Sequence, residues 1–207
     1  MPVIAVSGHS RKVGKTSIVE GLIAALPEYD WTALKVSSHR HYVDSVKDYV
    51  VSEETSRDGE TDTSRFLGAG ARRAFWIRAE RIEAAIPAIQ AIINDSQYVA
   101  IEGNRVLDFI NVDFSILVLN GGGVEFKESA RGILHRADAL VLIGENAATV
   151  EWEYFLETTP KNTLRFRTSD PKIFPQALKE LLRFRFPGEN LLKTDTILQN
   201  SAVKLIF

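Results

Sequence analysis

Short runs of Val, Ile, Leu and Ala recur along the chain and are separated by polar or amphipathic stretches. Such continuous apolar runs are typical of strands that are buried on both faces of a parallel sheet. The runs predict strands at residues 3–6, 32–36, 74–77, 98–102, 114–119, 139–143 and 163–166. The stretches between them predict helices at residues 15–26, 62–68, 81–94, 127–136, 148–156 and 170–184. This alternation predicts a three-layer α/β fold, with a mostly parallel central sheet of about seven strands and helices on both faces.

Two segments depart from this alternation. Residues 39–62 are acidic and show little periodicity, so we interpret them as a long excursion, either a lid or substrate loop or a merely solvated loop. Residues 187–207 end in the apolar run AVKLIF, which predicts either an added edge strand or a contact with another subunit in a homodimer. No internal repeat or low-complexity linker interrupts the sequence. Residues 1–207 are therefore expected to form one domain.

The first predicted strand runs directly into the segment GHSRKVGKT, residues 8–16. Gly14, Lys15 and Thr16 stand at the start of an apolar helix, which is the arrangement of a phosphate-binding loop. Glycines allow backbone N–H groups to approach phosphate oxygens, and the amino end of the helix adds a partial positive charge. Lys15 is expected along the β and γ oxygens, and the Thr16 hydroxyl is expected to bind Mg²⁺. The sequence thus predicts a site for a nucleoside triphosphate and magnesium.

The loop departs from the common pattern in its spacing. Five residues separate Gly8 from Gly14, where that pattern has four, and His9 occupies the usual position of the first glycine. We nevertheless expect the whole loop to surround the phosphates. The residues expected to contact the nucleotide are Gly8, His9, Ser10, Arg11, Lys12, Val13, Gly14, Lys15, Thr16 and Ser17.

A carboxylate is predicted beside this loop. The strand at residues 98–102 ends in Glu102, at the sheet edge where open α/β folds place their ligands. There Glu102 would hold Mg²⁺ directly or through water and complement Thr16. Gly103 lets the following backbone pass close to the phosphates. Thr16 and Glu102 are therefore the predicted metal-site residues, and Lys15 and Glu102 are two of the predicted catalytic residues.

The second predicted strand ends in a segment rich in hydrogen-bond donors, KVSSHRH, residues 35–41. Its lysine, hydroxyls, imidazoles and arginine suit a phosphate or carboxylate group. Lys35 is the third predicted catalytic residue, and His39 and His41 are expected on the substrate side. A metal site at the two histidines is disfavoured, because the chain has no cysteine and offers no evident third ligand.

The composition limits which binding partners and which cellular location are expected for this protein. A net charge of −2 gives no overall attraction to nucleic acid or to an anionic membrane, so any polyanion is expected to bind locally. The absence of cysteine excludes disulfides and thiol catalysis. No apolar run approaches the ~20 residues of a membrane-spanning helix. A soluble protein of the cytoplasm is expected, with a purine nucleotide as its ligand.

Four sequence features occur in an order seen in one known family. They are the phosphate loop, the segment with Lys35 and the histidines, the stretch DTSRFLGAGARRAFWI and the strand end AIEGNR. Over residues 3–105 the chain resembles the MobB-type proteins, the nucleotide-binding proteins of molybdopterin-guanine dinucleotide biosynthesis. The resemblance implies the P-loop NTPase fold, GTP with Mg²⁺, slow hydrolysis and a partner protein of molybdenum-cofactor biosynthesis. It also implies ligand-side roles for Lys35, His39, Asp62, Thr63 and Arg65.

The spacing of the phosphate loop is instead similar to that of dethiobiotin synthetase. The five-residue interval and Val13 before Gly14 resemble that enzyme, although Lys35-Val36 lacks its proline and Asn104 follows Gly103 where the enzyme is rich in glycine. This resemblance implies an ATP-dependent ligase or synthetase in which Lys35 orients a carbamate or carboxylate. A third alternative is a binding module without turnover. GTP and ATP stay open, because no guanine-reading Asn-Lys-x-Asp tetrad follows residues 139–143.

Overall fold

The computed structural model describes residues 1–38, 48–120, 128–144, 157 and 159–188. The strands are β1 (Val3–Gly8), β2 (Trp31–Ser38), β3 (Tyr49–Glu53), β4 (Arg73–Ala79), β5 (Tyr98–Glu102), β6 (Phe114–Asn120), β7 (Ala139–Ile143) and β8 (Leu164–Thr168). The helices are α1 (Lys15–Ala25), α2 (Asp62–Gly68), α3 (Ile82–Asn94), α4 (Glu128–Arg131) and α6 (Gln176–Arg185), with the short 3₁₀ turns η1 (Arg105–Asp108) and η2 (Leu134–Arg136). The predicted α/β class is confirmed.

The strands form an eight-stranded sheet in the order β3-β4-β2-β5-β1-β6-β7-β8. Neighbouring strands run parallel, except that β3 is antiparallel to β4. The chain builds the sheet on one side of β1 as far as β5 and on the other side from β6 onward. Ligands of open α/β sheets bind beside the carboxyl ends of the strands at such a reversal. The topology therefore places the loop after β1 at a preferred ligand position.

The interpretation of residues 39–62 as one long loop is wrong, because the segment contains the strand β3. Residues 49–53 pair with β4, with Tyr49 opposite Ala79 and Glu53 opposite Phe75. They form the edge of the sheet and are largely half-exposed, so they lack the apolar run by which the sequence predicts the buried strands. The sheet has eight strands rather than about seven for this reason. Residues 39–47 of the same segment lie outside the described residues.

Two predicted helices are shorter in the structure. Within the described residues 128–136 the chain forms α4 and η2, which Gly132 and Ile133 separate. Within residues 170–184, α6 begins only at Gln176, directly after its N-cap residue Pro175, because the fixed φ of proline suits the beginning of a helix. The predicted helix at 148–156 and the chain from residue 189 onward lie outside the described residues. Within the described ranges, no helix is long and apolar enough to cross a membrane.

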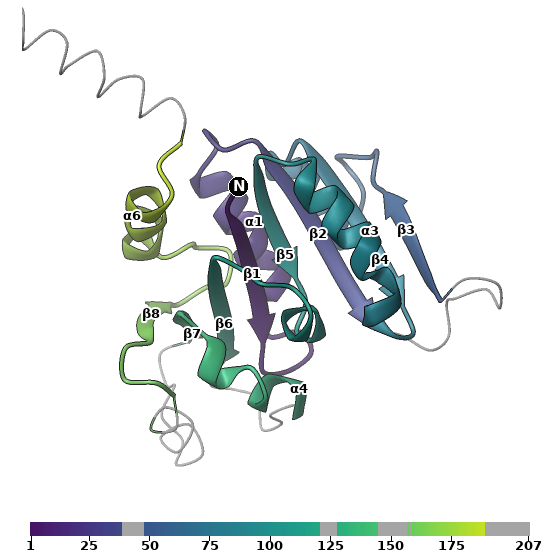
Figure 1. The fold of residues 1–207 in the computed structure, drawn as a ribbon. Coiled ribbons are helices and arrows are strands. Elements are labelled where there is room, and N and C mark those ends of the chain that lie inside the picture. The colour runs from purple at the N-terminus through teal and green to yellow at the C-terminus, as the bar shows by residue number, and fades with distance from the viewer. Residues whose placement is uncertain (39–47, 121–127, 145–156, 158, 189–207) are drawn as a thin grey trace, which may run out of the picture.

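Helices cover both faces of the sheet (Figure 1). On one face, α1, α2 and α6 pack onto the strands through Ile18, Leu22, Phe66 and Leu178. On the other face, α3 packs through Ile89 and its neighbours onto β2, β4 and β5, while η1 and η2 cover β6 and β7. The three layers leave the carboxyl ends of the central strands for the candidate site.

The strands change character along their length on the face that α1 covers. Ala33 of β2 and Ala100 of β5 lie in the apolar core, whereas the next residues on the same face are Lys35 and Glu102. Glu102 lies opposite Lys35 in the β5–β2 pair, and Lys35 lies opposite Trp76 in the β2–β4 pair. The register thus aligns the side chains of Glu102, Lys35 and Trp76 in a row across the sheet.

Candidate functional site

The loop between β1 and α1 has a tightly constrained backbone. Gly14 has φ 104°, and a Cβ there would lie 2.9 Å from Ile143 Cδ1. A Cβ on Gly8 would lie 2.5 Å from Val13 Cγ1. Lys12 has φ 56°, a left-handed conformation that costs a non-glycine residue about 1 kcal/mol. The loop therefore needs both glycines and holds one residue in a strained conformation, which is common at ligand-binding loops.

Lys15 and Thr16 occupy the first turn of α1. Lys15 Nζ donates a hydrogen bond to the Ser10 carbonyl oxygen at 3.1 Å, so the side chain folds back along the loop. The first turn of α1 contains no acidic residue. The partial positive charge at the amino end of the helix is therefore not neutralised by its own first turn, and it adds to the charge of Lys15.

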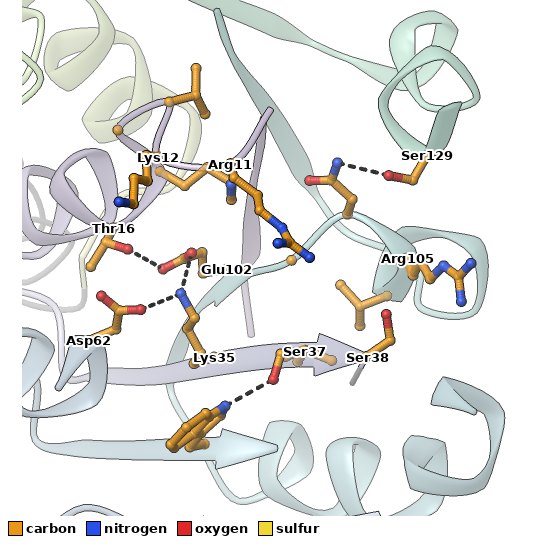
Figure 2. A pocket seen from close by; sticks show the side chains of 18 of the residues that line it. Arg11, Lys12, Thr16, Lys35, Ser37, Ser38, Asp62, Glu102, Arg105 and Ser129 are labelled. Atoms are coloured by element: carbon orange, nitrogen blue, oxygen red, sulfur yellow. Dashed lines mark hydrogen bonds and ion pairs between the residues drawn. The ribbon is translucent and has the colours of Figure 1, made fainter. Parts of the chain in front are cut away.

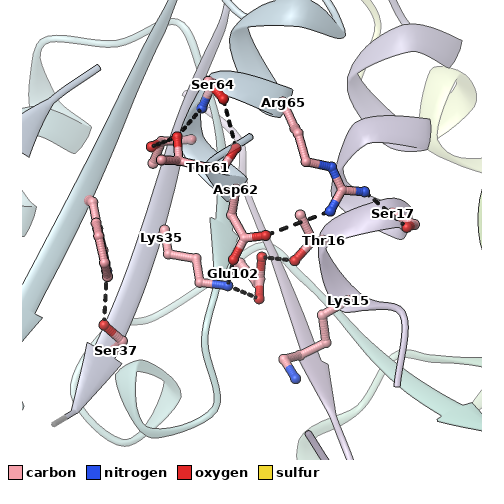
Figure 3. Close-up of polar contacts among 12 residues, drawn as sticks. Lys15, Thr16, Ser17, Lys35, Ser37, Thr61, Asp62, Ser64, Arg65 and Glu102 are labelled. Carbon is pink, nitrogen blue, oxygen red and sulfur yellow. Dashed lines mark hydrogen bonds and ion pairs between the residues drawn. The ribbon is translucent and has the colours of Figure 1, made fainter. Parts of the chain in front are cut away.

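Glu102 is the centre of an ionic cluster (Figure 3). Its Oε2 accepts a hydrogen bond from Thr16 Oγ1 at 2.9 Å, and its Oε1 lies 2.6 Å from Lys35 Nζ. The same Nζ lies 2.5 Å from Asp62 Oδ2. The Glu102 side chain is 3% exposed and that of Lys35 is 19% exposed, so water and salt screen this pair only weakly. The cluster joins α1, β2, β5 and α2.

Arg65 extends the cluster along α1 and α2. Its guanidinium lies 2.5 Å from Glu20 Oε2, 3.3 Å from the Ser17 hydroxyl and 3.7 Å from Asp62 Oδ1. Because Ser17 follows Thr16 in sequence, the contacts form a closed ring that includes the first turn of α1. Figure 3 shows this ring, with Lys15 beside it.

Capping of α2 positions Asp62 in this ring. The Thr61 side chain accepts a hydrogen bond from the Ser64 N–H at 3.0 Å, as an N-cap residue does. Glu54 Oε2 accepts hydrogen bonds from the hydroxyls of Thr61 at 2.8 Å and Thr63 at 3.0 Å. The Ser56 N–H and these hydroxyls lower the pKa of Glu54 below its usual range. The start of α2 is therefore anchored to the segment after β3.

Two titratable groups near the loop are shifted in opposite senses. Burial acts to lower the pKa of Lys35, but the charges of Glu102 and Asp62 outweigh it and raise that pKa above its ordinary value. Burial lowers the pKa of His9, and the positive charge of Lys15 lowers it further, while the Val118 backbone acts in the opposite sense. Lys35 is therefore a cation at neutral pH, whereas His9 is a neutral imidazole.

A cavity of about 720 Å³ opens above the loop and the ionic cluster (Figure 2). The predicted site residues that line it are Arg11, Lys12, Val13, Gly14, Lys15, Thr16, Ser17, Lys35, Asp62, Arg65 and Glu102. The cavity continues beyond the cluster to Ser37, Trp76 and Arg105. Trp76 donates its indole N–H to Ser37 Oγ at 3.0 Å, which fixes the ring at this end.

Four predicted contact residues are not brought to this cavity. Gly8 and His9 use their backbone N–H groups inside the fold, toward Asn104 Oδ1 at 3.0 Å and the Val118 carbonyl at 3.2 Å. The His9 side chain is buried, which separates it from a ligand in the cavity.

Ser10 is not a lining residue either, and Thr63 is buried against Glu54. His39 and His41 lie outside the described residues.

The donor set at Thr16 and Glu102 fits a hard divalent cation. One hydroxyl and one carboxylate oxygen, 2.9 Å apart, meet at the amino end of α1. In the part of the chain that the structure describes, no group of three or more His, Cys, Asp or Glu side chains could hold a metal by itself. Mg²⁺ suits such a site because it keeps several waters and takes further oxygens from phosphates.

The sequence analysis did not predict several of the residues that line the cavity. Trp76 and Ser129 come from segments predicted only as secondary structure, and the approach of Trp76 depends on the pairing of β4 with β2. Asn104 follows Glu102 by two residues and bonds to Gly8 across the sheet. Its place directly after the acidic strand end was a signal that could have found it.

No protein-family model and no curated protein matches the chain. Solved structures with a similar fold include HypB from Helicobacter pylori in complex with nickel. The TM-score is 0.54 and the sequence identity is 15%, and the alignment covers 86% of this chain and 84% of the HypB chain. MinD from Aquifex aeolicus has a TM-score of 0.46, 14% identity and 92% coverage of each chain.

LpxK from Aquifex aeolicus in complex with ATP has a TM-score of 0.48 and 22% identity, and it covers 81% of this chain. The present chain spans about half the length of LpxK, 53%. Identities at this level establish the fold alone, and the specific resemblance to MobB-type proteins stays a prediction. The eight-stranded order and the likeness to HypB show that the chain has the α/β fold of P-loop NTPases.

Proposed function

We propose that this protein binds a purine nucleoside triphosphate together with Mg²⁺ and hydrolyses it slowly. The observation that carries the proposal is the contact between Thr16 Oγ1 and Glu102 Oε2, 2.9 Å long, beside Lys15 at the amino end of α1. It joins a glycine-constrained phosphate loop to a buried carboxylate on a neighbouring strand. That combination suits a triphosphate and a divalent cation, and it lies in a cavity large enough for such a ligand.

The residues of the chain divide the work of charge stabilisation. Lys15 and the amino end of α1 would neutralise the β and γ oxygens, while Lys35, kept protonated by Glu102 and Asp62, adds a second cation where charge develops. Thr16 and Glu102 would hold Mg²⁺, which when bound supplies Lewis-acid neutralisation of the phosphate oxygens.

The arrangement of carboxylates supports slow turnover. Among the described residues that line the cavity, the carboxylates are Asp62 and Glu102. Lys35 Nζ lies within 2.6 Å of an oxygen of each. A general base needs an oxygen directed at the attacking water, and both side chains are engaged by a cation instead.

The resemblance to MobB-type proteins supplies a finer proposal. The nucleotide is then GTP, and the protein acts in the cytoplasm as an accessory of molybdenum-cofactor biosynthesis with a partner enzyme. Support comes from the residues carried over by that resemblance, since Lys35, Asp62, Arg65 and Glu102 meet in one cluster from the three elements β2, α2 and β5.

Thermal unfolding with ATP, GTP, ADP and GDP, each with Mg²⁺, tests nucleotide binding. A ligand at 100 times its dissociation constant should stabilise the folded protein by about 2.7 kcal/mol. Lys15→Ala should abolish this shift, whereas Lys161→Ala, an exposed lysine far along the chain, should keep it. An unchanged shift in Lys15→Ala would rule out the proposed phosphate contact.

A second candidate function is ATP-dependent transfer to a small acid, as in dethiobiotin synthetase. The observation that favours it is the extension of the cavity past Lys35 to Ser37 and Trp76, which a triphosphate does not need. Turnover that saturates with an added small carboxylic acid would support this candidate over simple hydrolysis. Nucleotide binding without any turnover would instead indicate a binding module.

A further inference from the structure

The chain directly after β5 remains bonded to β1. The two strands are paired up to Val6 opposite Glu102, and the Gly103 N–H donates to the Val6 carbonyl at 3.1 Å. Beyond this point β1 has no backbone partner in β5, and the Asn104 side chain takes over the hydrogen bonds to β1. The Gly8 N–H donates to Asn104 Oδ1 at 3.0 Å, and Asn104 Nδ2 donates to the Gly8 carbonyl at 2.9 Å. One carboxamide thus satisfies both backbone groups of the residue that begins the phosphate loop.

The opposite side of β1 is held by β6. Gly8 lies opposite Val118, and the His9 N–H donates to the Val118 carbonyl at 3.2 Å. The first residues of the loop are therefore fixed from both sides of β1. The Gly8 N–H is bonded to the Asn104 side chain and the His9 N–H to β6, so the amides available to a ligand begin further along the loop.

Residues 102–104, which we call the β5 clamp, contact both ends of the phosphate loop. Glu102 accepts a hydrogen bond from Thr16 at the carboxyl end of the loop, and Asn104 pairs with Gly8 at the amino end. Gly103 has no room for a side chain, because a Cβ there would lie 2.9 Å from the Val36 carbonyl oxygen. The clamp therefore lies close against β2 where it spans the loop.

The contacts of Asn104 are directed at the protein. Oδ1 accepts from Gly8, and the two hydrogens of Nδ2 are directed at the Gly8 carbonyl and, at 3.4 Å, at Ser129 Oγ. Figure 2 shows the bond to Ser129 at the wall of the cavity. Although Asn104 lines the cavity, its hydrogens are already used. The geometry therefore suits positioning better than recognition of a ligand.

We infer that Asn104 is a positioning residue that sets the amino end of the phosphate loop in register with Glu102, so that Lys15 and Thr16 are preorganised for phosphate and metal. Its effect on nucleotide affinity rests on the proposed function, whereas its effect on the loop does not. A loop that is already ordered loses less conformational entropy when it binds a ligand.

Hydrogen exchange of the ligand-free protein tests the clamp independently of any nucleotide. In Asn104→Ala, the amides of residues 10–14 should exchange faster than in the wild type, while those of β6 and β7 stay unchanged. Asn104→Asp keeps the acceptor for the Gly8 N–H and loses the donor to its carbonyl, so its loop amides should exchange at an intermediate rate. Equal acceleration across all strands would indicate a general structural role and overturn the inference.

Nucleotide affinity tests the consequence. With GDP or ADP and without Mg²⁺, Asn104→Ala should raise the dissociation constant about tenfold, the effect expected for the loss of one or two net hydrogen bonds. Asn94→Ala is the matched control, because this exposed asparagine accepts a hydrogen bond from Gln90 on α3 and does not line the cavity, and it should stay within twofold of wild type. An unchanged affinity in Asn104→Ala would also overturn the inference. If the wild type itself binds neither nucleotide, the proposed function fails and the exchange result alone decides the role of Asn104.

Discussion

The two halves of β2 differ sharply although they belong to one strand. Trp31 and Ala33 lie in the core under α1 and α2, and the Trp31 indole N–H donates to the Leu26 carbonyl at 2.9 Å. Lys35, only two residues further on the same face, is held by Glu102 and Asp62 at the wall of the cavity. The same face of the sheet thus carries apolar side chains where helices cover it and paired charges where the cavity opens. The first half of β2, with Trp31 and Ala33, should therefore determine the stability of the fold. The second half, from Lys35 onward, should determine ligand binding.

Removal of Trp31 should give the largest effect on folding. Trp31→Ala creates a cavity in a fully packed region and should lower the free energy of unfolding by about 3–5 kcal/mol. Urea denaturation measures this loss, and nucleotide affinity per folded molecule should stay near wild type. A loss below about 1 kcal/mol would contradict the division between the two halves.

Replacement of Lys35 should cost less stability but affect the site. Lys35→Met leaves Glu102, 3% exposed, without its cation and should lower the free energy of unfolding by about 2–3 kcal/mol. The double variant Lys35→Met/Glu102→Gln should recover part of this loss, because the uncompensated charge is then gone.

A surface ion pair provides the control for that experiment. Arg72, 68% exposed, lies 2.7 Å from Asp30, and Arg72→Ala should change stability by less than about 1 kcal/mol. Equal losses for Lys35→Met and Arg72→Ala would show that the buried cluster is no more coupled than an exposed pair.

Replacement of Glu102 should separate metal dependence from phosphate binding. Glu102→Gln is expected to raise the Mg²⁺ concentration for half-maximal hydrolysis at least tenfold, the size typical of losing a metal-site partner. Affinity for GDP or ADP without Mg²⁺ should change by less than about threefold, because Lys15 and the loop are intact. Titration of Mg²⁺ at fixed nucleotide measures the first quantity. Equal losses in both quantities would argue against a metal role for Glu102.

The pH dependence of stability should show the smallest effect. The folded-state pKa of Lys35 is raised above its ordinary value of 10.5 by Glu102 and Asp62, despite burial. Its contribution to stability is therefore fully present below about pH 10.5 and is lost as the pH rises through the folded pKa. Wild type should lose stability more steeply than Lys35→Met as the pH rises above about 10.5. Parallel curves for the two proteins would contradict the charge coupling.

The sequence predicted those parts of the fold that carry a local signal. The buried strands β5 and β7 were predicted with their observed bounds, since each is a continuous apolar run. The helix bounds of α2 were also predicted, where Thr61 caps the helix. β3 was not predicted, because an edge strand is half-exposed and lacks a continuous apolar run. Its pairing with β4 depends on the fold and cannot be predicted from residues 49–53 alone.

The sequence by itself determined which chemical groups the candidate site contains. Gly14, Lys15 and Thr16 must lie together because they are consecutive, and a carboxylate at the end of a buried strand must emerge at the sheet edge. Tertiary structure alone decided which groups meet across the sheet. Lys35, Asp62 and Glu102 come from three elements far apart in sequence, and Asn104 reaches Gly8 only because β5 lies beside β1. The physical reason is that strand order and register depend on long-range packing, which no local run of residues encodes.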